Sequence, residues 1–178
     1  RYVTYAKQVV QATTLTAIDM PAGPSEVLVL ADETAIPSYI ASDLLAQAEH
    51  GVDSQAVLVC TSSEIIASVL AEIDKQLSDL PRAAIAAEAI ANSYVIKVDS
   101  LEEGMKFSNQ YAPEHLIIAS DHYESLVPAI VNAGSVFLGN LTPESAGDYA
   151  SGTNHTLPTS GFARAYSGVS IDSFIKKI

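Results

Sequence analysis

The stretch Val27-Leu28-Val29-Leu30-Ala31 is a continuous apolar run that ends at the carboxylate of Asp32. A run of this length without polar alternation is typical of a strand that is buried on both faces, as the strands of parallel sheets are. Further strands are expected at residues 56–60, 94–98, 116–119 and 134–139.

Segments with helical spacing separate these runs. Apolar residues recur at helical intervals from Ile36 to Ala48, which predicts a helix over residues 37–50 with Gly51 as its terminator. Further helices are expected within residues 1–20, 62–77, 81–92 and 121–133, and after Ser100. Strands that alternate with helices predict a single α/β domain over residues 1–178, with a largely parallel sheet and helices on both faces.

The charge and the amino-acid composition argue against some classes of function. Nine Lys and Arg stand against 21 Asp and Glu, and the net charge of −12 argues against a nucleic-acid partner. No apolar run is long enough for a membrane helix, and Cys60 has no second cysteine to pair with, so a cytoplasmic protein is expected. Because the sequence begins with Arg1 rather than Met, we expect it to be a piece of a longer chain.

Glu114 and His115 form an adjacent carboxylate and imidazole just before the apolar run 116–119. Pro113 stiffens this loop and favours an extended conformation for Ala112. A Glu and a His can divide acid and base work, because their pKa values lie on either side of neutrality and respond to burial. The simpler interpretation is a pair of ionisable residues on a solvated loop.

Two other stretches carry candidate ligands. Asp43, Gln47 and His50 share one polar face of the helix expected over 37–50, for which a solvated surface is the simpler interpretation. Residues 139–160 lose the strand–helix rhythm and form a loop that carries Asp148 and His155, and long loops in compact domains are usually functional or disordered. No dense HxxxH or CxxC spacing is present, so spacing alone is weak evidence for a metal.

Four segments, in this order, resemble the histidinol dehydrogenase family: Gly23–Val27, Ser42–Gly51, Tyr111–Leu116 and Thr142–His155. The resemblance implies an incomplete Rossmann-like α/β domain of a cytoplasmic, zinc-dependent homodimer. It also implies the NAD-dependent oxidation of L-histidinol through L-histidinal to L-histidine, the last step of histidine biosynthesis. No GxGxxG motif follows a strand, so the α/β pattern carries no dinucleotide fingerprint. The resemblance implies that the contacts to the nicotinamide cofactor come largely from a preceding part of the family's chain.

The resemblance also implies roles for individual residues. Gln47, His50 and Asp148 match three zinc ligands, and Ser25 matches a substrate contact. The same three ligands and His115 also line the substrate, while Glu114 and His115 match the acid–base pair. Residues 139–160 then form an active-site loop. A fourth zinc-ligating histidine and a substrate-binding glutamate belong to a later part of the family's chain, which reaches the partner subunit's site. We therefore expect this piece not to turn over substrate alone.

Two other functions remain open. A zinc hydrolase would use Gln47, His50 and Asp148 as ligands and Glu114 as the base for a metal-bound water. A non-catalytic binding domain would use the loop motifs for partner contacts, and loss of Glu114 and His115 would leave its function unchanged.

Overall fold

The structure is a computed structural model that describes residues 2–176 and 178. Its centre is a five-stranded sheet in which all strands are parallel, as the apolar runs predict. The strands are β1 (Glu26–Ala31), β2 (Gln55–Cys60), β3 (Tyr94–Lys97), β4 (His115–Ala119) and β5 (Ser135–Leu138). Their order across the sheet is β3-β2-β1-β4-β5. This is the order of the first five strands of a classical Rossmann sheet, which confirms the predicted incomplete Rossmann-like fold.

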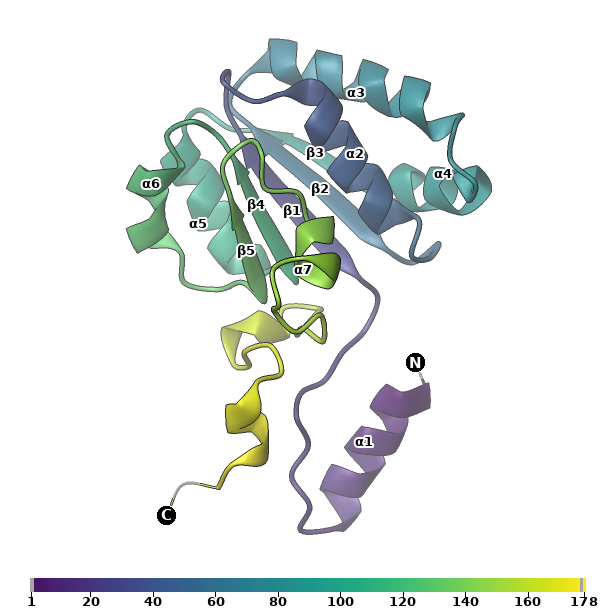
Figure 1. The fold of residues 1–178 in the computed structure, drawn as a ribbon, viewed down its shortest axis with the longest axis vertical. Coiled ribbons are helices and arrows are strands. Elements are labelled where there is room, and N and C mark those ends of the chain that lie inside the picture. Colours follow the sequence, from purple (N-terminus) through teal and green to yellow (C-terminus); the bar gives the residue numbers. More distant parts are fainter. Residues whose placement is uncertain (1, 177) are drawn as a thin grey trace.

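Helices cover both faces of the sheet (Figure 1). On one face lie α2 (Pro37–Ala48), α3 (Ser63–Leu77) and α4 (Ala83–Ala91), and on the other lie α5 (Leu101–Tyr111) and α6 (Tyr123–Leu126). Each central strand contributes side chains to two hydrophobic cores, one on each face of the sheet, because successive side chains point to opposite faces. Val27 and Val29 of β1 pack under α2, whereas Leu28 and Leu30 pack under α5. Burial of the central strands on both sides explains their unbroken apolar sequence.

The segments before β1 and after β5 lie outside the sheet. Helix α1 (Tyr2–Thr13) stands apart from it in Figure 1, has no buried residue and reaches β1 through an extended linker. After β5, the chain forms the short helix α7 (Ser145–Tyr149) and two 3₁₀ turns, Phe162–Arg164 and Ile171–Phe174. Within the described residues, none of the helices is long and apolar enough to cross a membrane.

Three local expectations are wrong. The helix expected over 121–133 is only α6 followed by a 3₁₀ turn at Val127–Ala129, because Pro128 lacks the N–H that would continue an α-helix. Helix α2 ends at Ala48 with Glu49 as a right-handed cap, so Gly51 does not terminate it. Ala112 is not extended but left-handed, with φ 56° and ψ 64°.

The conformation of Ala112 follows from its place at the end of α5. Its N–H donates to the Ser108 carbonyl at 2.7 Å, and its side chain is fully buried. A left-handed cap of this kind satisfies a carbonyl in the last turn of the helix. The helix end and the burial thus override the steric preference that Pro113 imposes on the preceding residue.

Candidate active site at the amino edge of the sheet

The candidate residues meet at the amino edge of the sheet, where its strands begin. Ser25 precedes β1, Glu114 precedes β4 and His115 is the first residue of β4. Helix α2 runs back to the same edge, so that Gln47 in its last turn and His50 in the following turn arrive there as well. The connections from helix to strand therefore bring these five residues together, although up to 90 positions separate them in the sequence.

The backbone of Glu26 holds both members of the Glu114–His115 pair. Its N–H donates to Glu114 Oε2 at 2.9 Å, and its carbonyl oxygen lies 3.1 Å from His115 Nδ1. Glu114 and His115 are both buried, with 6% and 7% of their surfaces exposed. A solvated loop is therefore the wrong interpretation of this pair.

Gln47 is a buried amide without an internal partner. It is fully buried, and neither its Oε1 nor its Nε2 has a hydrogen-bond partner. An unsatisfied buried polar group costs about 1–3 kcal/mol, so such a group calls for a ligand or a functional reason. The solvated-face interpretation of α2 is therefore wrong at Gln47, whereas His50 is exposed beyond the end of the helix.

The chain after β5 brings the remaining candidate residues to the site. Asn140 Nδ2 donates to the Thr34 carbonyl near the opposite edge, and the Glu144 N–H then donates to Asp43 Oδ1 on α2. This path carries the chain back across α2, so that Asp148 on α7 and His155 beyond it reach the amino edge.

The assembled residues line a cavity of about 210 Å³. Its buried members are Gln47, Glu114, His115 and Glu144, whereas Ser25, His50, Asp148 and His155 are half-buried or exposed. All six residues proposed from the resemblance are thus in one place. Glu144 was not among them, and His155 was only a possible ligand; their sole sequence signal is the Thr142–His155 segment.

Burial shifts the titration of the acid–base groups. It raises the pKa of Glu114 to about 8, and the neighbouring charges of Glu26, Glu144 and Asp148 add to this effect against the hydrogen bond from Glu26 N–H. Burial likewise raises the pKa of Glu144 to about 7, helped by Asp148 and Asp43. Burial lowers the pKa of His115. A neutral imidazole and a carboxyl that titrates near neutrality are suited to base and acid–base work.

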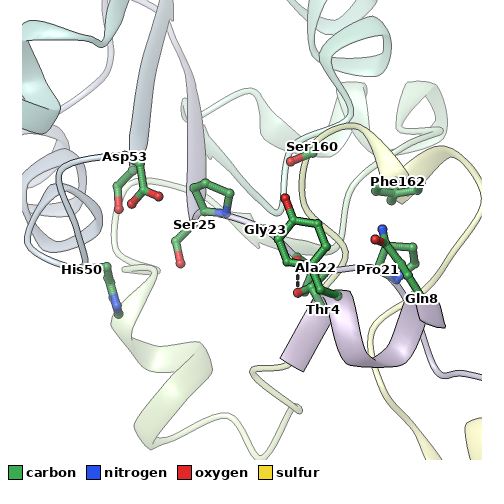
Figure 2. A pocket seen from close by; sticks show the side chains of 13 residues that line it. Thr4, Gln8, Pro21, Ala22, Gly23, Ser25, His50, Asp53, Ser160 and Phe162 are labelled. Carbon is green, nitrogen blue, oxygen red and sulfur yellow. Dashed lines mark hydrogen bonds between the residues drawn. The ribbon is translucent and has the colours of Figure 1, made fainter. Parts of the chain in front are cut away.

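A larger cleft of about 530 Å³ adjoins this cavity and shares Ser25 and His50 with it. Figure 2 shows these two side chains on one side of the cleft, with Asp53 beside them. On the other side lie Thr4 of α1 and Phe162, and the Thr4 hydroxyl donates to the Ala22 carbonyl at 2.6 Å. The cavity therefore opens towards the space between α1 and the sheet domain.

The donor chemistry of the cavity suits a divalent cation. In the described part of the chain, no three His, Cys, Asp or Glu side chains form a metal cage by themselves. The set Gln47, His50 and Asp148 contains only two residues of those types, with the unpartnered amide as the third. Imidazole and carboxylate are usual zinc ligands, and a metal would satisfy the amide oxygen. These residues fit a bound zinc ion.

At the carboxyl edge of the sheet, side chains after β1 and β4 are hydrogen-bonded to one another. Sheets of this kind bind nucleotides at the carboxyl ends of the strands where their order reverses, here β1 and β4. At that point Ser120 Oγ donates to Asp32 Oδ2 at 2.5 Å, and Thr34 donates to Asp32 Oδ1. Asp32 and Ser120 are both buried and hydrogen-bonded to each other.

The fold and the site define a Rossmann-like α/β domain with a buried Glu–His pair and candidate metal ligands at the amino edge of its sheet. The sequence model of the histidinol dehydrogenase family matches residues 1–178. The chain therefore belongs to the histidinol dehydrogenase family.

Individual relatives agree with this assignment. The histidinol dehydrogenase of Bacteroides thetaiotaomicron is 60% identical over the whole chain, which covers 41% of that protein. The histidinol dehydrogenase of Xanthomonas campestris pv. campestris (strain 8004) is 57% identical over 97% of the chain and 40% of that protein. The crystal structure of histidinol dehydrogenase from Elizabethkingia anophelis matches with a TM-score of 0.97 and 60% identity, over all of this chain and 41% of that one. The chain thus spans about two fifths of the length of these relatives.

Proposed function

We propose that this chain forms the zinc-binding and acid–base part of a histidinol dehydrogenase, which oxidises L-histidinol through L-histidinal to L-histidine with NAD⁺. The observation that carries the proposal is the convergence of Ser25, Gln47, His50, Glu114, His115 and Asp148 on one cavity. The family match over the whole chain supports the same reaction over a hydrolase or a binding domain.

Gln47, His50 and Asp148 would hold the zinc. When bound, the metal supplies orientation and polarisation of the substrate. Ser25 lies between the cavity and the cleft beside α1, where it would contact histidinol. The nicotinamide contacts would come largely from other parts of a longer chain, as the resemblance to the family implies. The homodimer typical of the resemblance and a cytoplasmic location belong to the same proposal.

The acid–base pair would divide the proton transfers. His115 is kept neutral by burial, so it would take the hydroxyl proton as the alcohol is oxidised. Glu114, once ionised above its pKa of about 8, would remove a proton from the water that hydrates the aldehyde before the second oxidation. Glu114→Gln should therefore spare alcohol oxidation more than aldehyde oxidation, and equal loss in both steps would reject this division.

The test is a histidinol-dependent NADH assay on the full-length protein, with and without a chelator. We expect activity that the chelator removes and that added zinc restores. Without histidinol-dependent NADH formation the proposal fails. Hydrolysis of ester or amide substrates that depends on Glu114 would then support the zinc hydrolase, and loss of neither activity on changing Glu114 and His115 would support a binding domain.

A further inference from the structure

Glu144 is a buried carboxylate to which the proposed function gives no role. It precedes α7 and is only 3% exposed, yet it lines the cavity together with Glu114 and His115. Burial of an ionisable group is costly, so a carboxylate in this position calls for a reason.

The hydrogen-bonding of His115 distinguishes its two ring nitrogens. Nδ1 lies 3.1 Å from the carbonyl oxygen of Glu26. A carbonyl only accepts hydrogen bonds, so Nδ1 must carry the hydrogen of the neutral ring. Nε2 is then the unprotonated nitrogen, and it is the atom that can take a proton from a substrate.

The carboxylate that faces Nε2 is Glu144. Its Oε1 lies 3.6 Å from Nε2, whereas Glu114 Oε2 lies 3.7 Å from Nδ1 and already accepts from the Glu26 N–H. The two glutamates therefore flank opposite ends of the same ring. Asp148, His50 and His155 are the other charged or titratable groups that act on the ring.

Glu144 is itself fixed from α2. Its backbone N–H donates to Asp43 Oδ1 at 3.1 Å, and Asp43 lies one turn before Gln47 on that helix. The side chain therefore approaches His115 from a segment that is anchored to the core rather than from a free loop.

We propose that Glu144 is a positioning residue for His115: its ionised carboxylate stabilises the proton that Nε2 receives and so holds the protonated ring in place against the Glu26 carbonyl. The inference rests on the proposed function. In the alcohol step the O–H bond of the substrate breaks and an N–H bond forms at Nε2, while hydride passes to the nicotinamide. The resulting imidazolium lies between the Glu26 carbonyl on Nδ1 and the Glu144 carboxylate near Nε2.

The test compares Glu144→Gln with wild type in the full-length protein, with Glu88→Gln on the exposed surface of α4 as the matched control. Three quantities are measured: kcat, KM for histidinol and the zinc content. A fourth is the titration midpoint of the His115 ring, followed by ¹⁵N NMR on chelator-treated protein with labelled histidine and assigned with His115→Asn.

We expect Glu144→Gln to lower kcat about ten-fold, which is less than the roughly 10²–10⁴-fold cost of losing a general base. KM and zinc content should stay near wild type, and the His115 midpoint should move to lower pH because a neighbouring negative charge is gone. Glu88→Gln should change none of these quantities.

Other outcomes would overturn the inference. A wild-type kcat with an unmoved His115 midpoint would show that Glu144 does not act on the ring. A raised KM at unchanged kcat would assign Glu144 to substrate binding, and lost zinc with activity restored by added zinc would assign it to the metal loop. If wild-type protein is inert with histidinol, the proposed function and the role of Glu144 in proton transfer are both refuted. The titration midpoint of the His115 ring would then still show whether Glu144 acts on that ring.

Discussion

Glu114 makes the stability of the protein depend on pH in a direction opposite to that of most carboxylates. Burial raises its pKa from 4.5 to about 8. Between these two pH values the unfolded chain has lost a proton that the folded protein keeps, so the free energy of unfolding falls as the pH rises. One group contributes at most about 1.4 kcal/mol per pH unit, which gives a loss of roughly 2–3 kcal/mol between about pH 6 and about pH 9.

Glu114→Gln removes this dependence and keeps the shape of the side chain. The amide oxygen can still accept from the Glu26 N–H, which donates to Glu114 Oε2 at 2.9 Å in the wild type. Any packing or hydrogen-bond cost of the amide is the same at each pH. The difference in stability between variant and wild type should therefore shift in favour of the variant as the pH rises, by the same 2–3 kcal/mol or so.

Thermal unfolding of the chelator-treated full-length proteins measures this shift. The relatives are more than twice as long as this chain, and the entropy of unfolding scales with length, so 1 kcal/mol shifts the Tm of the full-length protein by about 1 °C. The Tm of Glu114→Gln relative to wild type should therefore rise by roughly 2–4 °C from about pH 6 to about pH 9. Exposed Glu88→Gln should follow wild type throughout. A Tm difference that stays constant with pH, or that moves against the variant, would refute the account of Glu114 as a carboxyl kept protonated by burial.

Three further predictions concern neighbouring residues. Gln47→Met should lower the zinc content yet raise the Tm of the chelator-treated protein, by about 1–3 kcal/mol of stability, because it removes an unpartnered buried amide; a lower Tm would contradict this. His115→Asn should lower kcat by about 10²–10⁴-fold and flatten the alkaline-rising limb of the pH–rate profile, and an unchanged profile would argue against His115 as the base. Gly134→Ala should lower stability by about 1–3 kcal/mol in thermal unfolding, because its Cβ would lie 2.5 Å from the Glu114 carbonyl oxygen; an unchanged Tm would show that the strand entry is not rigid.

The fold was largely predictable from local sequence. The apolar runs mark strands because β1, β2 and β4 are buried on both faces, and the helical spacing marks α2 and α3. The strand order was beyond reach of periodicity, since pairing of β1 with β4 depends on contacts between residues that are 88 positions apart, such as Val27 and His115. The prediction of a helix over 121–133 is wrong from Pro128 onward, because proline has no N–H to continue the α-helical hydrogen bonds that the surrounding residues would allow.

The site was less predictable than the fold. Spacing places Gln47 and His50 near each other, but it cannot show that Gln47 is fully buried while His50 is exposed beyond the helix end. Glu144 carries no signal of its own, because its role depends on the path of the chain from β5 back across α2. Only the resemblance of whole segments could connect such distant residues in advance.

The location of the site at the amino edge has a physical basis in the first residue of β1. The N–H and the carbonyl of Glu26 are the backbone groups that bind Glu114 and His115. Backbone N–H groups stabilise a carboxylate that burial destabilises, and a carbonyl fixes which imidazole nitrogen carries hydrogen. Since Val27 pairs in register with His115, the sheet itself sets the distance between Glu26 and the acid–base pair. At the carboxyl edge, by contrast, the side chains of Ser120 and Thr34 donate to Asp32. The same parallel sheet thus has a cluster of hydrogen-bonded side chains at one edge, and at the other a single backbone residue that holds both Glu114 and His115.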